Sequence, residues 1–157
     1  MKTAPNTVET SPGNDARIAL DRYETLLNTV NGIVWEADAA TLSFTFVSPG
    51  VQSILGYSAE EWLHTPGFWE DHIYHADRDA AVIYCQTQIA QLHNHELEYR
   101  MVQADGSLIW IKDVVTVIAE EGKAKWLRGI MVDVTETRLM AALEHLEKQV
   151  LELNARP

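Results

Sequence analysis

The chain has 157 residues, 46% of them hydrophobic, and a formal net charge of −11 at pH 7. This length fits a single domain, and the composition is sufficient for a hydrophobic core. The negative charge argues against nucleic acid and anionic membranes as partners, because clustered Lys and Arg bind both. Apolar runs such as VVTVIA are too short to insert into a bilayer, and a single cysteine cannot form an internal disulfide. We therefore expect a cytoplasmic protein.

The first 31 residues divide into a tail and a helix. Residues 1–14 are rich in Thr, Pro, Asn, Ser and Gly, which is typical of a disordered tail. Residues 15–31 carry apolar side chains at helical spacing from Ile18 to Val30, and Asn31-Gly32 ends the pattern. We predict an N-terminal flanking helix whose apolar face covers the outer surface of a sheet.

Two strands and a group of short helices follow. Alternating side chains predict strands at 33–38 and 44–47. Ser48, just before a proline, predicts the capped start of a short helix. Ser58 and Glu61 have the spacing of a capping box, which predicts a second short helix.

A longer helix and three strands complete the pattern. The helix is predicted at 77–92, and strands are predicted at 95–102, 108–119 and 125–135, the first two joined by an Asp-Gly turn. One face of the long helix is predicted to contain Ala80, Ile83, Tyr84, Thr87 and Ala90.

This order predicts an α+β fold, with one five-stranded antiparallel sheet and short helices on one of its faces, within residues 32–135. The space between the sheet and these helices, here called the cup, is of a kind that holds small ligands. Residues 136–157 are predicted to form a C-terminal helix.

Four segments in this order resemble a PAS domain of the PAS/PAC sensor type, over roughly residues 20–137. They are FVSPGVQSILGYSAEEW, FWEDHIYHADRD, EYRMVQADGSLIWIKD and GIMVDVTETR. In the second segment Ala76 follows His75, where the family usually has Pro after His. The last segment contains Asp133-Val134-Thr135 in place of the family's Asp-Ile-Thr.

The resemblance implies a sensory module of bacterial signal transduction, as in two-component systems. A ligand or a change of dimer state would alter the sheet, and the exit helix would pass this change to an effector such as a histidine kinase or a diguanylate cyclase. The chain itself is not expected to be an enzyme, because it contains no effector and no catalytic motif.

Cofactors of the family's light and haem sensors are not expected. Flavin-binding relatives place amide side chains where this chain has Met101, Ile111 and Met131, and their reactive Cys word is missing. Haem-binding relatives place an axial His about three residues after an Arg such as Arg78, where this chain has Ala81. Haem and flavin therefore remain remote alternatives, and we predict no cofactor.

Neither metal binding nor catalysis is predicted from the polar residues. His72, His75 and Asp77 have tolerable ligand spacing but no strong signature, and His75 and Asp77 are better interpreted as caps of the long helix. His95 is assigned, with His93, to an exposed loop. Asp113 falls on the same strand face as Ile109 and Ile111, where burial would raise its pKa, but no second acid or nucleophile accompanies it. The simpler interpretation puts Asp113 near the solvent end of its strand or beside a basic residue.

The cup is predicted to be apolar. A small apolar or amphipathic ligand could occupy it, with room left by Gly129, or the side chains could fill it completely, which would leave a ligand-free dimerisation or docking module. The candidate lining residues are Val34, Phe46, Ile54, Leu55, Phe68, Trp69, Ile73, Ile83, Tyr84, Leu97, Tyr99, Met101, Ile109, Ile111, Leu127, Gly129 and Met131.

The end of the last strand is predicted to be the signal hinge. Asp133 and Thr135 can cap the exit helix, and the family pattern suggests that Asp133 pairs with Arg100. The exit helix then carries apolar residues at spacings of four, three, four and three, which favours a coiled coil and a homodimer through the terminal helices. The seam residues are Leu139, Leu143, Leu146, Val150 and Leu153.

Overall fold

The computed structural model describes residues 12–156. Residues 1–11 of the predicted tail lie outside the described part, and the predicted boundary at residue 14 falls inside the first helix. The elements are, in order, α1 (Pro12–Thr29), β1 (Ile33–Asp38), β2 (Phe44–Val47), α2 (Gly50–Leu55), α3 (Ala59–His64), α4 (Phe68–His72), α5 (His75–Ala90), β3 (His95–Val102), β4 (Leu108–Glu120), β5 (Lys123–Asp133) and α6 (Thr135–Asn154).

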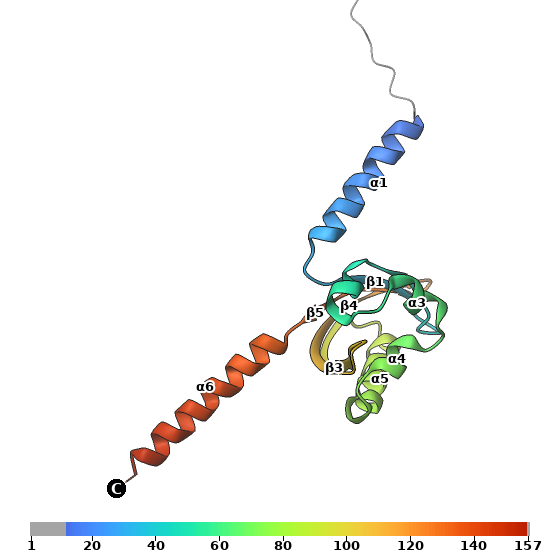
Figure 1. Cartoon of the computed structure of the whole chain (residues 1–157). Coiled ribbons are helices and arrows are strands. Elements are labelled where there is room, and N and C mark those ends of the chain that lie inside the picture. The colour runs from blue at the N-terminus through green and yellow to red at the C-terminus, as the bar shows by residue number, and fades with distance from the viewer. Residues whose placement is uncertain (1–11, 157) are drawn as a thin grey trace, which may run out of the picture.

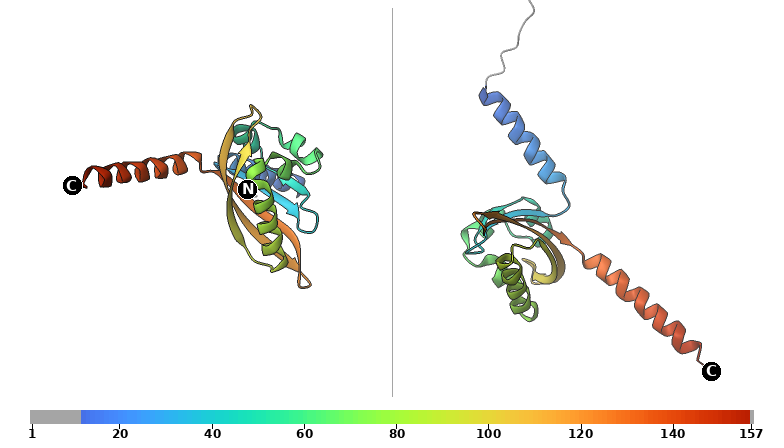
Figure 2. Two further views of the ribbon diagram at one scale, coloured as in Figure 1. Left: turned by 90° about the horizontal axis from the view of Figure 1, so that it is seen from below. Right: turned by 180° about the vertical axis from the view of Figure 1, so that it is seen from behind.

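The five strands form one antiparallel sheet in the order β2-β1-β5-β4-β3. Helices α2 to α5 lie on one face of this curved sheet, as Figures 1 and 2 show. The α+β class, the five strands and the flanking helices predicted from the sequence are confirmed. Because β1 pairs with β5, the first and last strands meet at the centre of the sheet.

Strand alternation separates an inner, helix-covered face from an outer one. On β1 the inner residues Ile33, Trp35 and Ala37 are all less than 5% exposed, whereas the residues between them are half-buried. Aromatic rings connect this face to the short helices, with centroids of Trp35 and Phe44 5.2 Å apart and those of Phe44 and Trp62 5.1 Å apart. The core therefore lies between the sheet and α2–α5.

Gly129 leaves space for an indole ring. It pairs with Trp35 across β1 and β5, and a Cβ at this position would lie 2.5 Å from the Trp35 ring and 2.5 Å from the Val114 carbonyl oxygen. The Trp35 indole thus occupies the space that a side chain at position 129 would need. The sequence-based idea that this glycine enlarges the cup for a ligand is wrong, because the indole fills the space.

Helix α5 is rotated relative to the face predicted from its sequence. Ala81, Cys85 and Ile89, at spacings of four, are its buried residues. Ile83 is 61% exposed and Tyr84 is 41% exposed, so the prediction that both line the cup is wrong. The buried face runs through positions 81, 85 and 89, one residue away from the predicted face, which leaves Ile83 and Tyr84 on the outer side of the helix.

The two predicted serine caps have different outcomes. The Ser58 hydroxyl accepts a hydrogen bond from the Glu61 N–H at 3.0 Å, which confirms that cap of α3. Ser48 does not cap α2, whose first turn has no side-chain cap. Its hydroxyl is fully buried and accepts from the Val34 N–H at 2.9 Å, so it joins β2 to β1.

Helices α1 and α6 project away from the core (Figures 1 and 2). No residue of α6 is buried. The apolar side chains Ile18, Leu20, Tyr23 and Leu26 of α1 are exposed, and Leu27 is half-buried. The prediction that α1 covers the outer sheet surface is therefore wrong in this structure. Within residues 12–156, no helix combines the length and apolarity that crossing a membrane requires.

Candidate functional site

A buried carboxylate lies in the middle of the cup. Asp113 of β4 is 2% exposed, and its Oδ1 accepts a hydrogen bond from Trp35 Nε1 at 3.0 Å. Its Oδ2 accepts from the Tyr99 hydroxyl at 2.8 Å, and that hydroxyl in turn accepts from Trp69 Nε1 at 2.9 Å. Side chains from α4, β3 and β1 are thus joined by hydrogen bonds to Asp113 of β4, which is the acceptor on both sides.

Burial dominates the electrostatics of this group. It raises the pKa of Asp113 from an ordinary 3.8 to about 7, although the hydrogen bonds from Tyr99 and Trp35 act in the opposite direction. Burial and the nearby Asp113 charge also raise the pKa of the Cys85 thiol to about 12, which keeps that thiol protonated. The pKa of Tyr99 is likewise raised, first by burial. Of Asp113, Cys85 and Tyr99, Asp113 is therefore the group whose pKa lies near neutrality.

His95 is a second polar group on the inner face. It begins β3 and is 6% exposed, so its assignment to an exposed loop is wrong. Its Nδ1 lies 2.9 Å from the carbonyl oxygen of His93, and its ring is edge-on to Tyr84. Its Nε2 is buried and has no hydrogen-bond partner among residues 12–156.

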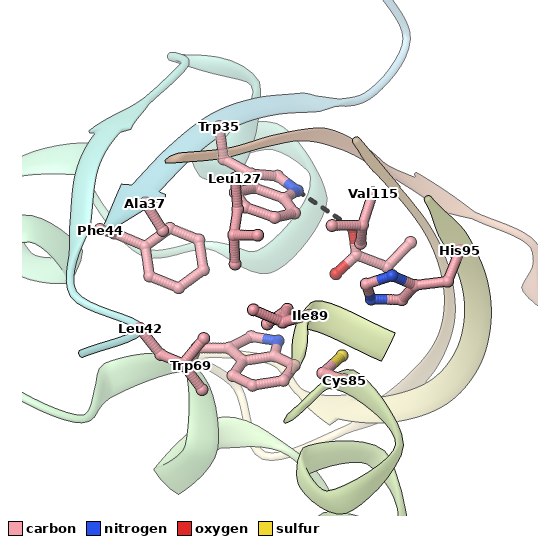
Figure 3. Close-up of a pocket in the computed structure, with 11 residues that line it drawn as sticks. Trp35, Ala37, Leu42, Phe44, Trp69, Cys85, Ile89, His95, Val115 and Leu127 are labelled. Carbon is pink, nitrogen blue, oxygen red and sulfur yellow. Dashed lines mark hydrogen bonds between the residues drawn. The ribbon is translucent and has the colours of Figure 1, made fainter. Parts of the chain in front are cut away.

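Asp113 and His95 border a small cavity of about 20 Å³, shown in Figure 3. Such a volume accommodates one water-sized guest. The rings of Trp35, Phe44 and Trp69 and the Cys85 thiol form part of its wall. Aliphatic residues complete the lining: Ala37, Leu42, Ile89, Val115 and Leu127.

Most of the predicted cup residues lie in the core, but few border this cavity. Only Trp69 and Leu127 do so. Val34 and Phe46 are on the wrong face, because both border a shallow groove on the outer surface beside Tyr23. The following predicted residues are buried or partly buried against the core: Ile54, Leu55, Phe68, Ile73, Leu97, Tyr99, Met101, Ile109, Ile111 and Met131.

Neither haem nor flavin fits these residues. A cavity of about 20 Å³ is more than tenfold smaller than the roughly 300 Å³ at which ligand pockets begin. Met101, Ile111 and Met131 are fully buried and offer no hydrogen bond to the polar edge of a flavin. Ala81, at the position of the haem ligand in the family, packs in the core.

The polar residues at the start of α5 do not form the predicted cap. His72 lies in α4, with Nδ1 2.7 Å from the Phe68 carbonyl oxygen, and Asp77 binds an arginine. The first turn of α5 has no side-chain cap. In the part of the chain that the structure describes, no three His, Cys, Asp or Glu residues are placed to hold a metal ion together.

Arg100 pairs with Asp77, so the prediction that it pairs with Asp133 is wrong. Arg100 Nε and Nη2 lie 2.8 Å and 2.7 Å from the two Asp77 carboxylate oxygens, and the Arg100 backbone N–H donates to Asp77 at 2.9 Å. These hydrogen bonds lower the pKa of Asp77. The physical reason is proximity, because the segment before α5 runs along the edge of β3, where the Tyr74 N–H donates to the Arg100 carbonyl at 2.8 Å.

A tryptophan on the outer face connects this ion pair to the exit helix. The Trp110 ring centroid lies 5.0 Å from Arg100 Cζ and 3.6 Å from Arg138 Cζ, so two guanidinium groups contact one ring. Arg138 of α6 also donates from Nε to Glu98 of β3 at 3.0 Å. We refer to Asp77, Glu98, Arg100, Trp110 and Arg138 as the arginine cluster.

The strand end that precedes α6 is held by the backbone of Trp110. The Val134 N–H donates to the Trp110 carbonyl at 2.9 Å, and the Trp110 N–H donates to the Thr135 hydroxyl at 2.9 Å. Asp133 is exposed, and its Oδ1 accepts from the Thr135 N–H at 3.0 Å and from the Thr135 hydroxyl at 2.6 Å. Asp133 and Thr135 therefore contact each other beside the first turn of α6.

The residues that sequence reasoning missed could in part have been found. His95 shares its strand parity with Leu97 and Tyr99, which were both assigned to the cup. Trp35 shares its strand parity with the inner residues Ile33 and Ala37, whereas Val34, the predicted cup residue, has the opposite parity. Trp110 and Arg138 carried no local signal, because their contact joins residues that are 28 positions apart in the chain.

The fold and its motifs match known proteins. A family model described as PAS fold matches residues 44–131. The N-terminal domain of a diguanylate cyclase with PAS/PAC sensor from Marinobacter aquaeolei is 28% identical, with 68% of this chain and 98% of that chain covered and a TM-score of 0.64.

Two further structures share the fold at lower identity. A sensory box histidine kinase/response regulator from Burkholderia thailandensis is 18% identical, with 83% and 98% of the two chains covered and a TM-score of 0.66. A domain of a putative light and redox sensing histidine kinase from Haloarcula marismortui is 21% identical, with 73% and 99% covered and a TM-score of 0.56. No curated protein sequence matches the chain.

Proposed function

The chain belongs to the PAS-fold family, and on that premise we propose that it is the sensory module of a larger signalling protein. In this proposal the cup receives the signal, the hinge at Asp133, Val134 and Thr135 transmits it, and α6 carries it to an effector. The effector is of the histidine kinase or diguanylate cyclase type, as in the similar proteins, and catalysis belongs to it. The cytoplasmic location rests on the sequence alone and stays a prediction.

The observation that carries this proposal is the way in which α6 is attached. No residue of α6 is buried, so the helix depends on contacts at its first turn. These contacts are made by Thr135 and Arg138, both to Trp110 of β4. A movement of β3 or β4 therefore has a short route to the direction of α6.

The arginine cluster supplies a link from the helices over the cup to this route. Asp77 begins α5, whose inner face borders the cavity through Cys85 and Ile89. Asp77 holds Arg100, and Arg100 contacts the same tryptophan ring as Arg138. A shift of α5 caused by a guest in the cavity would thus reach the exit helix through side chains that are in contact.

We also propose that the apolar stripe of α6 pairs with a second copy of the chain. The five seam residues, from Leu139 to Leu153, are between 47% and 63% exposed, and their alternating spacing of four and three fits a coiled coil. Two heptads give only a marginal coiled coil alone, so the pairing depends on continuation into the effector or on support from α1.

The hinge is tested in a chimera of this chain with a histidine kinase core, joined in helical register after α6. We expect Asp133→Ala and Arg138→Ala to change the autophosphorylation rate at least about threefold, which corresponds to at least about 0.6 kcal/mol of coupling. The matched control is Lys112→Ala, since Lys112 forms an exposed ion pair with Glu96 on the same sheet. Rates equal to wild type in both hinge variants, with folding intact, would contradict the proposal.

The dimer is tested by sedimentation of the same chimera. Leu146→Glu places a charge in the proposed seam and should shift the protein from dimer to monomer. Leu151→Glu is the matched control, because Leu151 is 70% exposed but lies outside the seam, and it should leave the dimer intact. A monomer at all concentrations for the parent protein excludes this part of the proposal.

A ligand-free dimerisation or docking module is the second candidate, and the small volume of the cavity favours it. Native mass spectrometry of the purified protein separates the two. A co-purifying small molecule supports the sensor, and an apo dimer without any bound mass supports the docking module.

A further inference from the structure

The hydrogen bonds around Asp113 are complete when its carboxyl is ionised. Trp35 Nε1 donates to Oδ1 at 3.0 Å, and the Tyr99 hydroxyl donates to Oδ2 at 2.8 Å. The Tyr99 oxygen in turn accepts from Trp69 Nε1 at 2.9 Å. An indole nitrogen only donates, so the direction of both tryptophan bonds is fixed. Three donor hydrogens thus meet three acceptor oxygens.

A proton added to Asp113 has no acceptor in this arrangement. On Oδ1 it would meet the Trp35 N–H, which is itself a donor, or would point into the apolar wall. On Oδ2 it would donate to the Tyr99 oxygen, and the Tyr99 hydrogen would then need a new acceptor. His95 borders the same cavity, but its Nε2 has no hydrogen-bond partner among residues 12–156, so Asp113 does not reach it. Protonation therefore breaks one of the bonds or leaves a buried O–H without a partner.

Burial has the opposite preference. Asp113 is 2% exposed, and an ionised carboxylate away from water is costly without a cation. The titratable side chains that face it are Tyr99 and His95 of β3 and Cys85 of α5, whereas β1, β2, α4 and β5 supply only uncharged side chains to this wall. No Lys or Arg of residues 12–156 borders the cavity. The pKa of Asp113, which burial raises to about 7 against its two hydrogen bonds, agrees with two nearly balanced states.

Two contacts lead from this carboxyl towards the exit helix. Trp69 belongs to α4, so a change at the Tyr99 hydroxyl reaches a helix that covers the cup. Arg100 follows Tyr99 in β3 and lies over the Trp110 ring, which Arg138 of α6 also contacts. A rearrangement at Tyr99 therefore begins one residue away from the arginine cluster.

We propose that Asp113 is a proton-operated switch, whose protonation rearranges its hydrogen bonds with Trp35 and Tyr99. The change at Tyr99 alters the position of Arg100 and, through the arginine cluster, the direction of α6. The signal that the cup detects is then pH, which requires no larger ligand than the cavity of about 20 Å³ accommodates. This inference rests on the proposed sensory function, because it names the signal of that same cup.

Carbon-13 NMR of the wild-type chain reads the protonation of Asp113 directly. The signal of its carboxyl carbon, assigned through its own backbone, should titrate with a midpoint near pH 7. Asp105, in the exposed β3–β4 turn, is the control, and its signal should not titrate in this range. An Asp113 signal that stays constant between about pH 5 and pH 8 overturns the proposal.

The indole N–H signals of the same protein report the hydrogen bonds. Those of Trp35 and Trp69 should shift with the midpoint of Asp113, whereas Trp126, on the outer face, is the control and should not. His95→Gln should retain both shifts, which separates Asp113 from the neighbouring imidazole. Indole signals that stay fixed while Asp113 titrates, or shifts that disappear in His95→Gln, overturn the proposal.

Tyr99→Phe tests the connection without replacing Asp113. The lost hydroxyl lowers the pKa of Asp113 in the wild-type protein, so the midpoint should rise by about one pH unit. The pH-dependent shift of the Trp69 indole should disappear, because Tyr99 joins it to Asp113. An unchanged midpoint in the folded variant overturns the proposal.

The kinase chimera tests the output. Its autophosphorylation rate should change at least about threefold between about pH 6 and pH 8, beyond the pH response of the kinase core alone. Asp113→Asn, which is neutral at both values, should abolish this change, and Asp105→Asn should retain it. A folded Asp113→Asn chimera with the full pH response overturns the proposal.

The hinge variants separate a failure of this inference from a failure of the proposed function. An output that responds to Asp133→Ala but not to pH overturns the proton switch and leaves the sensory role standing. An output that responds neither to pH nor to Asp133→Ala and Arg138→Ala overturns the sensory role and the switch with it.

Discussion

On the inner face of the sheet, Asp113 is enclosed by uncharged donors and the pKa of its carboxyl rises to about 7. At the edge of the same sheet, Asp77 binds the guanidinium of Arg100, and the pKa of its carboxyl falls. Asp113 accepts two hydrogen bonds from uncharged donors, whereas Asp77 accepts three from Arg100, two of them from its guanidinium. Burial and the presence of a cation decide the difference between the two pKa values.

This contrast separates a carboxylate that contributes to the stability of the fold, Asp77, from one whose burial reduces it, Asp113. The Asp77 pair is a partly exposed contact between α5 and β3 that favours the charged form. An apolar residue in place of Asp113 would leave the Trp35 N–H and the Tyr99 hydroxyl without their acceptor, which is costly inside the core. A buried carboxyl beside a cavity, with a pKa near neutrality, is instead typical of a functional site.

The largest effect is expected from the donor that covers the inner carboxylate. Trp35→Ala should lower the free energy of unfolding by about 3–5 kcal/mol, because it removes a buried indole and one donor to Asp113. Trp126→Ala is the control on the outer face, where the ring is only half-buried, and should cost about 1 kcal/mol or less. Urea unfolding measures both, and equal losses would remove the distinction between the two faces.

The pH dependence of stability sharpens the comparison further. Since the pKa of Asp113 rises on folding from 3.8 to about 7, the folded state binds a proton more readily than the unfolded chain, and stability falls as pH rises between these values. Between about pH 5 and pH 8 this loss is about 3 kcal/mol. Asp77 acts in the opposite direction, because its lowered pKa gives stability that is lost only as pH falls below about 4.

We therefore expect Asp113→Asn to flatten the stability curve between pH 5 and pH 8. Unfolding in urea at several pH values measures this, and the difference from wild type isolates Asp113, because both proteins contain the same six histidines. Asp105→Asn, in the exposed β3–β4 turn, is the control. A slope in the Asp113 variant equal to that of wild type would show that the carboxyl is not the group that titrates.

A single methyl group tests the close packing of the inner face. Gly129→Ala should destabilise the protein by about 1–3 kcal/mol, because the new Cβ meets a backbone oxygen as well as the Trp35 ring. Gly13→Ala is the matched control, since nothing lies within 4 Å of a Cβ there, and it should not lower stability. If Gly129→Ala unfolds at the same urea concentration as wild type, the indole does not occupy that space in solution.

The smallest effect is expected at the edge. Asp77→Asn should lower Tm by about 2–4 °C, because it weakens the contact between α5 and β3 at a partly exposed site. Glu96→Gln, which weakens the exposed pair with Lys112, should change Tm by about 1 °C or less. Differential scanning calorimetry distinguishes them, and a larger loss from Glu96→Gln would contradict the assigned role of the Asp77 pair.

Several features of the fold followed from local pattern. Alternating side chains predicted the five strands, and helical spacing with Gly and Pro at the ends predicted the helices. The spacing of Ser58 and Glu61 predicted the cap of α3. Each of these signals depends on neighbouring residues only. The four motif segments identified the family, and its model matches the chain. The apolar stripe of α6 was visible as spacing, and its exposure agrees with a helix whose cover is not within the described chain.

Tertiary structure alone decided which polar groups meet. Strand parity placed Asp113 on the correct face, but the expectation of a solvent-exposed position or a basic neighbour was wrong. Its partners come from β1 and β3, 78 and 14 positions away, and no local pattern reveals them. The same holds for Arg100, which was predicted to pair with Asp133 but pairs with Asp77 because the segment before α5 runs along β3. The rotation of α5 was likewise set by packing against the sheet. Local sequence determined the elements, because their hydrogen bonds are local. Long-range packing determined the cavity, because its walls come from seven separate elements and the turn at Leu42.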